Sequence, residues 1–144
     1  MKKPVLHVLA LLALALGLYA GLAIAQDTAS RGAEAAVANA QSGFGVLQGK
    51  WVRPDGGYVI TIKSVDASGK LDAAYANPRP LPFSKAVASH DGKSIKVFLE
   101  LQAGGYNGST YTLVYDPARD ILKGAYFQAV AQQKYDIYFE RTRP

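Results

Sequence analysis

The chain contains no cysteine, and this absence excludes disulfides, thiolate metal centres and cysteine nucleophiles. Histidine is almost as rare, because His7 and His90 are the only two in 144 residues. His90 lies in "ASHDGK", a composition that predicts a solvated turn rather than a catalytic base. The sequence therefore predicts no catalytic residue, no metal site and no cofactor, and a protein that is not an enzyme.

The N-terminus has the pattern of an export signal. Lys2 and Lys3 give a positive start, residues 5–22 are almost entirely apolar, and residues 23–25 form a small-residue cleavage site. We expect residues 1–25 to be a signal peptide and the mature protein to be periplasmic or secreted by a bacterium, with no stable membrane insertion. The alternative is an uncleaved membrane anchor, which the glycines within the apolar stretch disfavour.

The charge is too small to indicate a nucleic-acid partner. Removal of residues 1–25 takes away two of the sixteen basic residues and none of the eleven acidic ones, which lowers the formal charge from +5 to +3. The remaining basic residues are spread over many segments and form no basic stripe, so we expect no nucleic-acid binding.

The expected mature chain has two contrasting parts. Residues 26–47 are rich in alanine and small polar residues, and we expect a flexible lead-in. Residues 48–144 are expected to form one folded domain, in which alternating apolar runs are separated by turn sequences about every 8–12 residues. The expected strands are 50–53, 58–65, 70–77, 83–88, 94–102, 109–115, 121–128 and 134–141.

This succession of eight strands predicts an all-β fold, an antiparallel up-and-down barrel built as a meander. The connections between the runs are too short for crossover helices. Eight is also about the number of strands at which a sheet closes around an interior that side chains fill or that holds one small ligand. Closure would remove the unpaired edges that an open antiparallel sheet exposes.

Alternation of period two separates an inward set of side chains from an outward one when Trp51 is taken as inward. The outward set carries the acidic residues of the strands, so no pair of interior carboxylates is available for hydrolysis. The inward set is Trp51, Arg53, Tyr58, Ile60, Ile62, Leu71, Ala73, Tyr75, Asn77, Ile95, Val97, Leu99, Leu101, Tyr111, Leu113, Tyr115, Leu122, Gly124, Tyr126, Gln128, Tyr135, Ile137, Phe139 and Arg141.

Counting strands up and down places Trp51 and Arg141 beside each other at the lower end of the barrel. The start "GKW" at Gly49, together with an arginine that ends the last strand, resembles the calycin superfamily of lipocalins and avidins. The segment "GKWVRPDGGYVITI" is similar to the opening hairpin of avidin-like proteins, and "GSTYTLVYD" is similar to strands of uncharacterised exported bacterial proteins. The resemblance implies that Trp51 closes the bottom of the barrel and that Arg141 packs over it.

The opposite, upper end is therefore where we expect a ligand. Polar inward residues gather at this rim with tyrosines just below, and tyrosine combines a flat apolar ring with a hydroxyl group that suits a small amphipathic or aromatic molecule. The alternative is that the tyrosines simply fill the interior. The expected ligand-binding residues are Arg53, Tyr58, Tyr75, Asn77, Tyr106, Asn107, Tyr111, Tyr126 and Gln128.

Two further interactions are compatible with the sequence. The protein could be a protein-interaction module, such as an inhibitor of an exported hydrolase, that uses residues 26–47 to enter the enzyme's cleft. It could also form a homo-oligomer through outward apolar residues of the strands. These residues are Val59, Phe98, Val114, Phe127 and Tyr138.

Overall fold

The computed structural model describes residues 30–34, 43–102 and 104–143. The expected signal peptide and most of the expected lead-in lie outside the described residues. The chain divides into two units, residues 1–36 and residues 37–144. In the first unit, residues 30–34 are helical and exposed. Within the parts of the chain that are described, no helix is both long and apolar enough to span a membrane.

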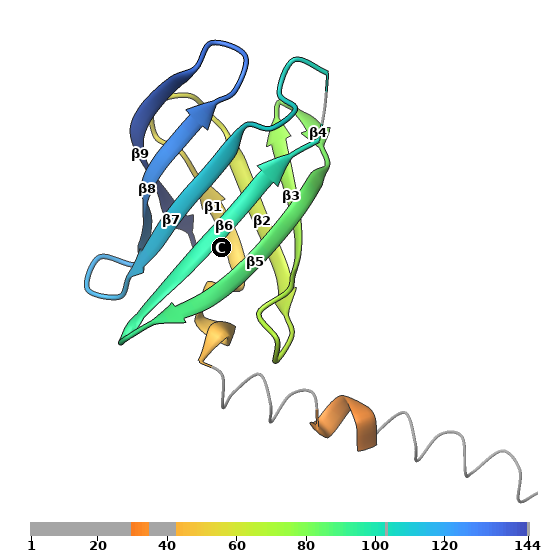
Figure 1. The fold of residues 1–144 in the computed structure, drawn as a ribbon. Coiled ribbons are helices and arrows are strands. Elements are labelled where there is room, and N and C mark those ends of the chain that lie inside the picture. The colour runs from red at the N-terminus through yellow and green to blue at the C-terminus, as the bar shows by residue number, and fades with distance from the viewer. Residues whose placement is uncertain (1–29, 35–42, 103, 144) are drawn as a thin grey trace, which may run out of the picture. The chain divides into compact units, whose positions relative to one another are not determined.

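The second unit is an antiparallel sheet that curls into a nearly closed barrel (Figure 1). The order of the strands in the sheet is β4-β3-β2-β1-β9-β8-β7-β6-β5. The first strand of the chain, β1, therefore pairs with the last strand, β9. The strands are β1 (Gly49–Val52), β2 (Val59–Val65), β3 (Leu71–Asn77), β4 (Arg79–Leu81), β5 (Phe83–Asp91), β6 (Ser94–Leu101), β7 (Thr110–Asp116), β8 (Ile121–Gln128) and β9 (Gln133–Thr142).

The structure confirms an all-β up-and-down barrel but corrects the number of strands from eight to nine. The additional strand, β4, lies within the sequence "PRPLP", which the turn chemistry alone assigns to a loop. Arg79–Leu81 pairs with the end of β3, and the chain then passes Pro82 and pairs with β6 as β5. Proline is tolerated in β4 because β4 is an edge strand, and its far side needs no ladder of N–H donors.

The barrel closes at its lower end between β3 and β5. Lys70 and Val87 form an isolated antiparallel bridge, and the backbone N–H of Ala88 donates to the carbonyl of Gly69 at 2.6 Å. Gly69 has a φ of 88°, and a Cβ there would lie 2.1 Å from the carbonyl oxygen of Ala88. Glycine is therefore required at position 69, both for its backbone conformation and for this close approach of the two strands.

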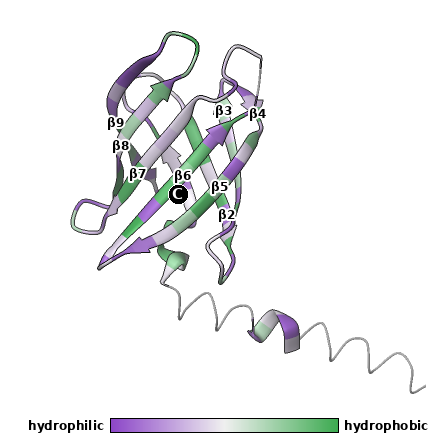
Figure 2. Ribbon diagram, in the orientation of Figure 1, coloured by the Kyte–Doolittle hydropathy of each residue, from purple (hydrophilic) through white to green (hydrophobic). Residues whose placement is uncertain are grey.

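The core occupies the inside of the barrel, as alternation predicts. Most leucine, isoleucine, valine and aromatic side chains of the inward set are buried or partly buried, with Tyr135 exposed at 43%, while hydrophilic positions lie between them along the strands (Figure 2). Val65 breaks the expected alternation, because it is buried at 2% exposure although it lies in the outward phase. The register of β2 against β3 shifts between Ile62 and Ser64, and this bulge turns Val65 inward.

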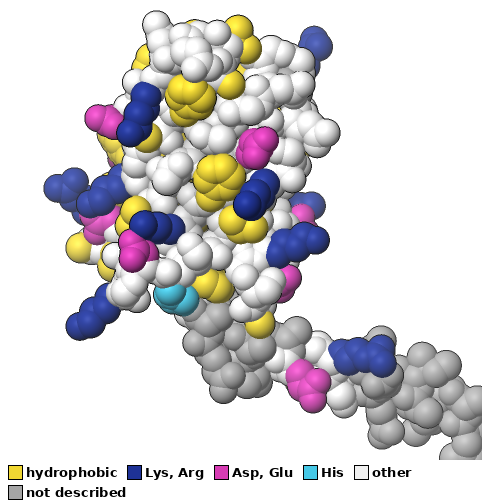
Figure 3. Space-filling model, viewed as in Figure 1, with side chains coloured by type: hydrophobic (Ala, Val, Ile, Leu, Met, Phe, Trp, Pro, Cys, Tyr) yellow, Lys and Arg dark blue, Asp and Glu magenta, His cyan; other side chains and the backbone are white. Residues whose placement is uncertain are grey.

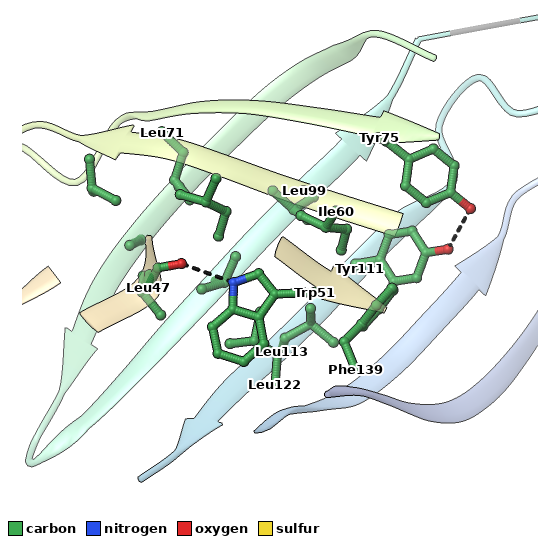
Figure 4. Close-up of a cluster of buried hydrophobic side chains, with 14 of the residues drawn as sticks. Leu47, Trp51, Ile60, Leu71, Tyr75, Leu99, Tyr111, Leu113, Leu122 and Phe139 are labelled. Carbon is green, nitrogen blue, oxygen red and sulfur yellow. Dashed lines mark hydrogen bonds between the residues drawn. The ribbon is translucent and has the colours of Figure 1, made fainter. Parts of the chain in front are cut away.

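A short 3₁₀-helix, η1 (Phe44–Leu47), packs against the lower end of the barrel. The sequence assigns these residues to the flexible lead-in, yet Phe44 is 5% exposed and Leu47 is fully buried. The indole Nε1 of Trp51 donates to the carbonyl of Leu47 at 2.9 Å (Figure 4). The segment "FGVL" is too short to show a periodicity, so its burial depends on the barrel it covers.

Candidate functional site

The lower end of the barrel is closed by Trp51 and Arg141. The two residues are direct partners in the register of β1 against β9, and the guanidinium carbon of Arg141 lies 4.1 Å from the centre of the indole ring. Trp51 is fully buried and also meets the ring of Tyr115 edge-on at 6.1 Å. This geometry leaves no surface of the indole for a ligand.

The guanidinium of Arg141 has partners on two separate segments. Its Nε donates to both carboxylate oxygens of Asp120, at 3.0 and 2.8 Å. Its Nη atoms donate to the carbonyl of Gln48 and, at 2.5 Å, to that of Val46. The hydrogen bond from Arg141 holds the pKa of Asp120 below its usual range. Arg141 therefore fastens η1 and the β7–β8 turn to the end of β9.

Gly49 makes room for this arrangement. Its φ is 138°, a value that side chains with a Cβ rarely adopt, and a Cβ at this position would lie 2.7 Å from an Nη atom of Arg141. The "GKW" sequence thus has a physical basis, because the glycine lets the arginine pass over the tryptophan two residues later.

The upper end contains a cavity of about 260 Å³. This volume lies just below the roughly 300–1,000 Å³ typical of sites for small molecules. Its lining is dominated by tyrosine: the lining residues are Arg53, Tyr58, Tyr75, Tyr106, Tyr111, Tyr126, Gln128 and Tyr135.

The tyrosine rings form a continuous series of contacts across the cavity wall. Tyr111 stacks on Tyr126 with ring centres 4.7 Å apart, and Tyr126 stacks in turn on Tyr135 at 6.2 Å. On the other side, Tyr75 lies 5.8 Å from Tyr111 and 6.4 Å from Tyr58. The series joins the residue just before β2 to β3, β7, β8 and β9, so the wall is assembled from segments far apart in the sequence.

The deepest part of this series is tied by a hydrogen bond. The hydroxyl groups of Tyr75 and Tyr111 lie 3.0 Å apart, and both side chains are buried (Figure 4). Burial raises the pKa of Tyr111 to about 12, and burial likewise raises the pKa of Tyr75. Both phenols are neutral at physiological pH and form a buried, polar floor to the cavity.

Arg53 supplies the positive charge of the cavity wall. It follows β1, and its guanidinium carbon lies 4.6 Å from the centre of the Tyr58 ring. Its Nε and Nη2 donate to the two carboxylate oxygens of Asp55 at 2.7 and 2.6 Å. These hydrogen bonds raise the pKa of Arg53 and lower that of Asp55. The Arg53 side chain is 12% exposed, whereas that of Asp55 is 63% exposed.

The structure brings seven of the nine sequence-predicted ligand residues together around this cavity. The two asparagines are the exceptions. Asn77 ends β3, where it pairs with Arg79, and Asn107 is exposed in the β6–β7 loop. Neither of them lines the cavity. Tyr135 lines it without having been selected, although its inward phase was the signal that pointed to it.

Ser109 was also missed. It is fully buried, and its hydroxyl oxygen accepts a hydrogen bond from the backbone N–H of Ala129 at 3.1 Å. Its own backbone N–H donates to the carbonyl of Tyr106. Ser109 thus joins the β6–β7 and β8–β9 connections at the rim and positions Tyr106. A serine before a strand carries no signal of this role, because the contact spans twenty residues.

The face of the barrel seen in Figure 3 carries charges of both signs. Basic and acidic side chains are interspersed on the face seen in Figure 3, with hydrophobic side chains between them. Tyr138 is 45% exposed, whereas Phe98 is partly covered by Lys85, whose Nζ lies 5.5 Å from its ring centre. The other apolar residues proposed for oligomerisation, Val59, Val114 and Phe127, are half-buried. In the described part of the chain, no three acidic or histidine side chains are grouped as metal ligands.

The fold and the cavity define a class: an antiparallel β-barrel, consistent with a calycin-like barrel, that is closed at one end and lined with tyrosine at the other. No protein-family model, curated protein or solved structure matches the chain.

Proposed function

We propose that this protein is an exported, non-enzymatic barrel of the calycin type that binds a small aromatic or amphipathic molecule at its upper end. The observation that carries the proposal is the cavity of about 260 Å³, whose wall contains six tyrosines and one arginine. Tyrosine faces contribute apolar and stacking contacts, and the hydroxyl groups fix the orientation of a polar substituent.

The difference between the two ends supports this choice of site. The lower end is filled by Trp51, Leu47 and Phe44, which are buried. The upper end keeps a cavity even though large tyrosine rings are present to fill it, and its rim includes the half-exposed Tyr135. A cavity lined by stacked rings accommodates one further flat ring without rearrangement of the strands.

Mass spectrometry under native conditions tests the proposal on protein purified from its own host, by detecting a co-purifying small molecule. Calorimetric titration with small aromatic compounds provides the second measurement. Gln128→Trp should block the cavity and abolish both signals, because Gln128 lines it. Lys134→Trp is the matched control, since this exposed residue lies on β9 and outside the lining. No bound molecule and no titration heat in the wild-type protein would contradict the proposal.

The alternative function is inhibition of an exported hydrolase by residues 26–47. For this function, fewer residues of the segment are available to enter an enzyme's cleft. Phe44 and Leu47 are buried against the barrel, so this part of the segment is not a free arm. Deletion of residues 26–42 separates the two functions, because a cavity binder retains its ligand without them and an inhibitor loses its activity.

A further inference from the structure

The charge on the described wall of the cavity is of one sign, positive. Arg53 is the one charged residue among the described lining residues, and the others are tyrosines and Gln128. None of the described lining residues is a carboxylate, so a cationic ligand would meet an uncompensated positive charge there. The Arg53 side chain is only 12% exposed, and an anionic group that accepts two hydrogen bonds from its guanidinium is favourable there.

Asp55 supplies that anionic group in the ligand-free protein, but it does so from outside the cavity. Its carboxylate faces the fork of Arg53 through two hydrogen bonds, yet its side chain is 63% exposed. The contact is local, because only Pro54 separates the two residues in the sequence. Exposed and local ion pairs are weak and exchange readily with solvent.

The turn that carries Asp55 lies beyond the last backbone pair of the hairpin formed by β1 and β2. Residues 54–57 lie outside the strands, and the backbone N–H of Arg53 donates to the carbonyl of Tyr58 at 2.9 Å, which closes the hairpin below the turn. The ring of Tyr58 lies beneath the guanidinium of Arg53. Arg53 is thus positioned by the strands and by Tyr58, and removal of the Asp55 carboxylate does not remove its support.

From this geometry we infer that the ligand is a small aromatic carboxylate whose carboxylate group displaces Asp55 from the fork of Arg53. The guanidinium fork matches any planar carboxylate in the two-bond manner already seen with Asp55. The ring of the ligand would then lie among the tyrosines beside Arg53. Asp55 acts as a competitor within the chain and keeps Arg53 paired while the cavity is empty. This inference rests on the proposed function and specifies its ligand class.

Calorimetric titration with naphthoate and with naphthamide tests the inference, because the two probes share a ring system and differ in charge. The wild-type protein should bind naphthoate at least about tenfold more tightly. Asp55→Asn should increase the affinity for naphthoate by about twofold and leave naphthamide unchanged, since the weak competing carboxylate is gone. Arg53→Gln should abolish the preference for the carboxylate.

Asp91→Asn is the matched control. Asp91 has the same side-chain exposure as Asp55, 63%, and is also paired with a basic residue, Lys96. The Asp91→Asn substitution therefore removes the same charge as Asp55→Asn without affecting a contact of Arg53. It should change neither the affinity for naphthoate nor that for naphthamide. Equal binding of the two probes, or the same gain in both aspartate variants, would overturn the inference and leave the proposed function intact. Binding of neither probe, with no co-purifying molecule, would contradict both.

Discussion

The two ends of the barrel use the same three kinds of residue in different ways. At each end, an arginine lies over an aromatic ring and faces an aspartate: Arg141 over Trp51 at the lower end, and Arg53 over Tyr58 at the upper end. Arg141 is bound to two segments that are far from it in the sequence, whereas the aspartate of Arg53 lies two residues away. Long-range partners make the lower arrangement a structural closure, and a local partner leaves the upper one exchangeable.

The largest difference is expected when each arginine is replaced by glutamine. Arg141→Gln should lower the free energy of unfolding by about 2–3 kcal/mol, because it removes the donor of two carbonyl groups and the charged partner of Asp120, which keeps only the hydroxyl of Tyr115. Arg53→Gln should cost about 1 kcal/mol or less, because its partner is exposed. Urea unfolding followed by circular dichroism measures both values. Equal losses would show that the two ends are energetically alike.

Alkaline pH should act on the upper end through Tyr111. Its pKa is raised from 10 to about 12 in the folded protein, so the folded state holds its proton where the unfolded state has lost it. The contribution of Tyr111 to the free energy of unfolding is therefore fully present below pH 10 and falls by about 2 kcal/mol as the pH approaches 12. Tyr111→Phe should remove this part of the decline in unfolding experiments at several pH values.

The same substitution also has a cost at neutral pH. It leaves the buried hydroxyl of Tyr75 without its partner, which should reduce the stability by about 1–2 kcal/mol. Tyr138→Phe is the control, because this tyrosine is 45% exposed on the outer wall. A decline at alkaline pH that is unchanged in Tyr111→Phe would assign the effect to other groups.

The smallest changes in the free energy of unfolding are expected when Asp120 or Asp55 is replaced. For Asp120, the change depends on acid pH. The pKa of Asp120 is lowered in the folded protein, so its contribution is present above about pH 3.8 and disappears as the pH falls through the folded value. Asp120→Asn should cost about 1 kcal/mol at neutral pH and flatten the acid decline. Asparagine also tolerates the φ of 53° at position 120, which avoids an unrelated strain.

Asp55→Asn is the corresponding change at the upper end. It should change the stability at neutral pH by less than about 0.5 kcal/mol, as expected for an exposed residue. Unfolding by urea at neutral and acid pH compares the two variants. A larger loss for Asp55→Asn than for Asp120→Asn would contradict the view that the upper pair is exchangeable.

Much of the barrel follows from local sequence features. Alternation identifies Ile60, Leu99 and Leu113 as core residues, and strand counting brings Arg141 to Trp51 across 90 positions. The additional strand does not alter the result of strand counting. β4 and β5 lie on either side of Pro82 and together take the place of one predicted strand. The same alternation points the tyrosines of the upper end into one cavity.

Other features depend on contacts that no local pattern reveals. The bulge in β2 that buries Val65 reflects the pairing of β2 with β3. The burial of Phe44 and Leu47 reflects the barrel end that they cover, and the role of Ser109 depends on Ala129. Asn77 and Asn107 were selected for their polarity near the rim, but the directions of the strand end and of the loop take them out of the cavity.

The sequence by itself determined the class of fold and the two faces of the strands, because period-two alternation and turn residues act over a few neighbours. Closure at the lower end, in contrast, was implied by the resemblance to calycins, and an open upper end stayed one of two alternatives. The tertiary structure decided that Arg141 is held by partners from distant segments and that the partner of Arg53 can be exchanged. That difference depends on whether the partners of each guanidinium come from distant segments or from the next turn, and packing alone determines it.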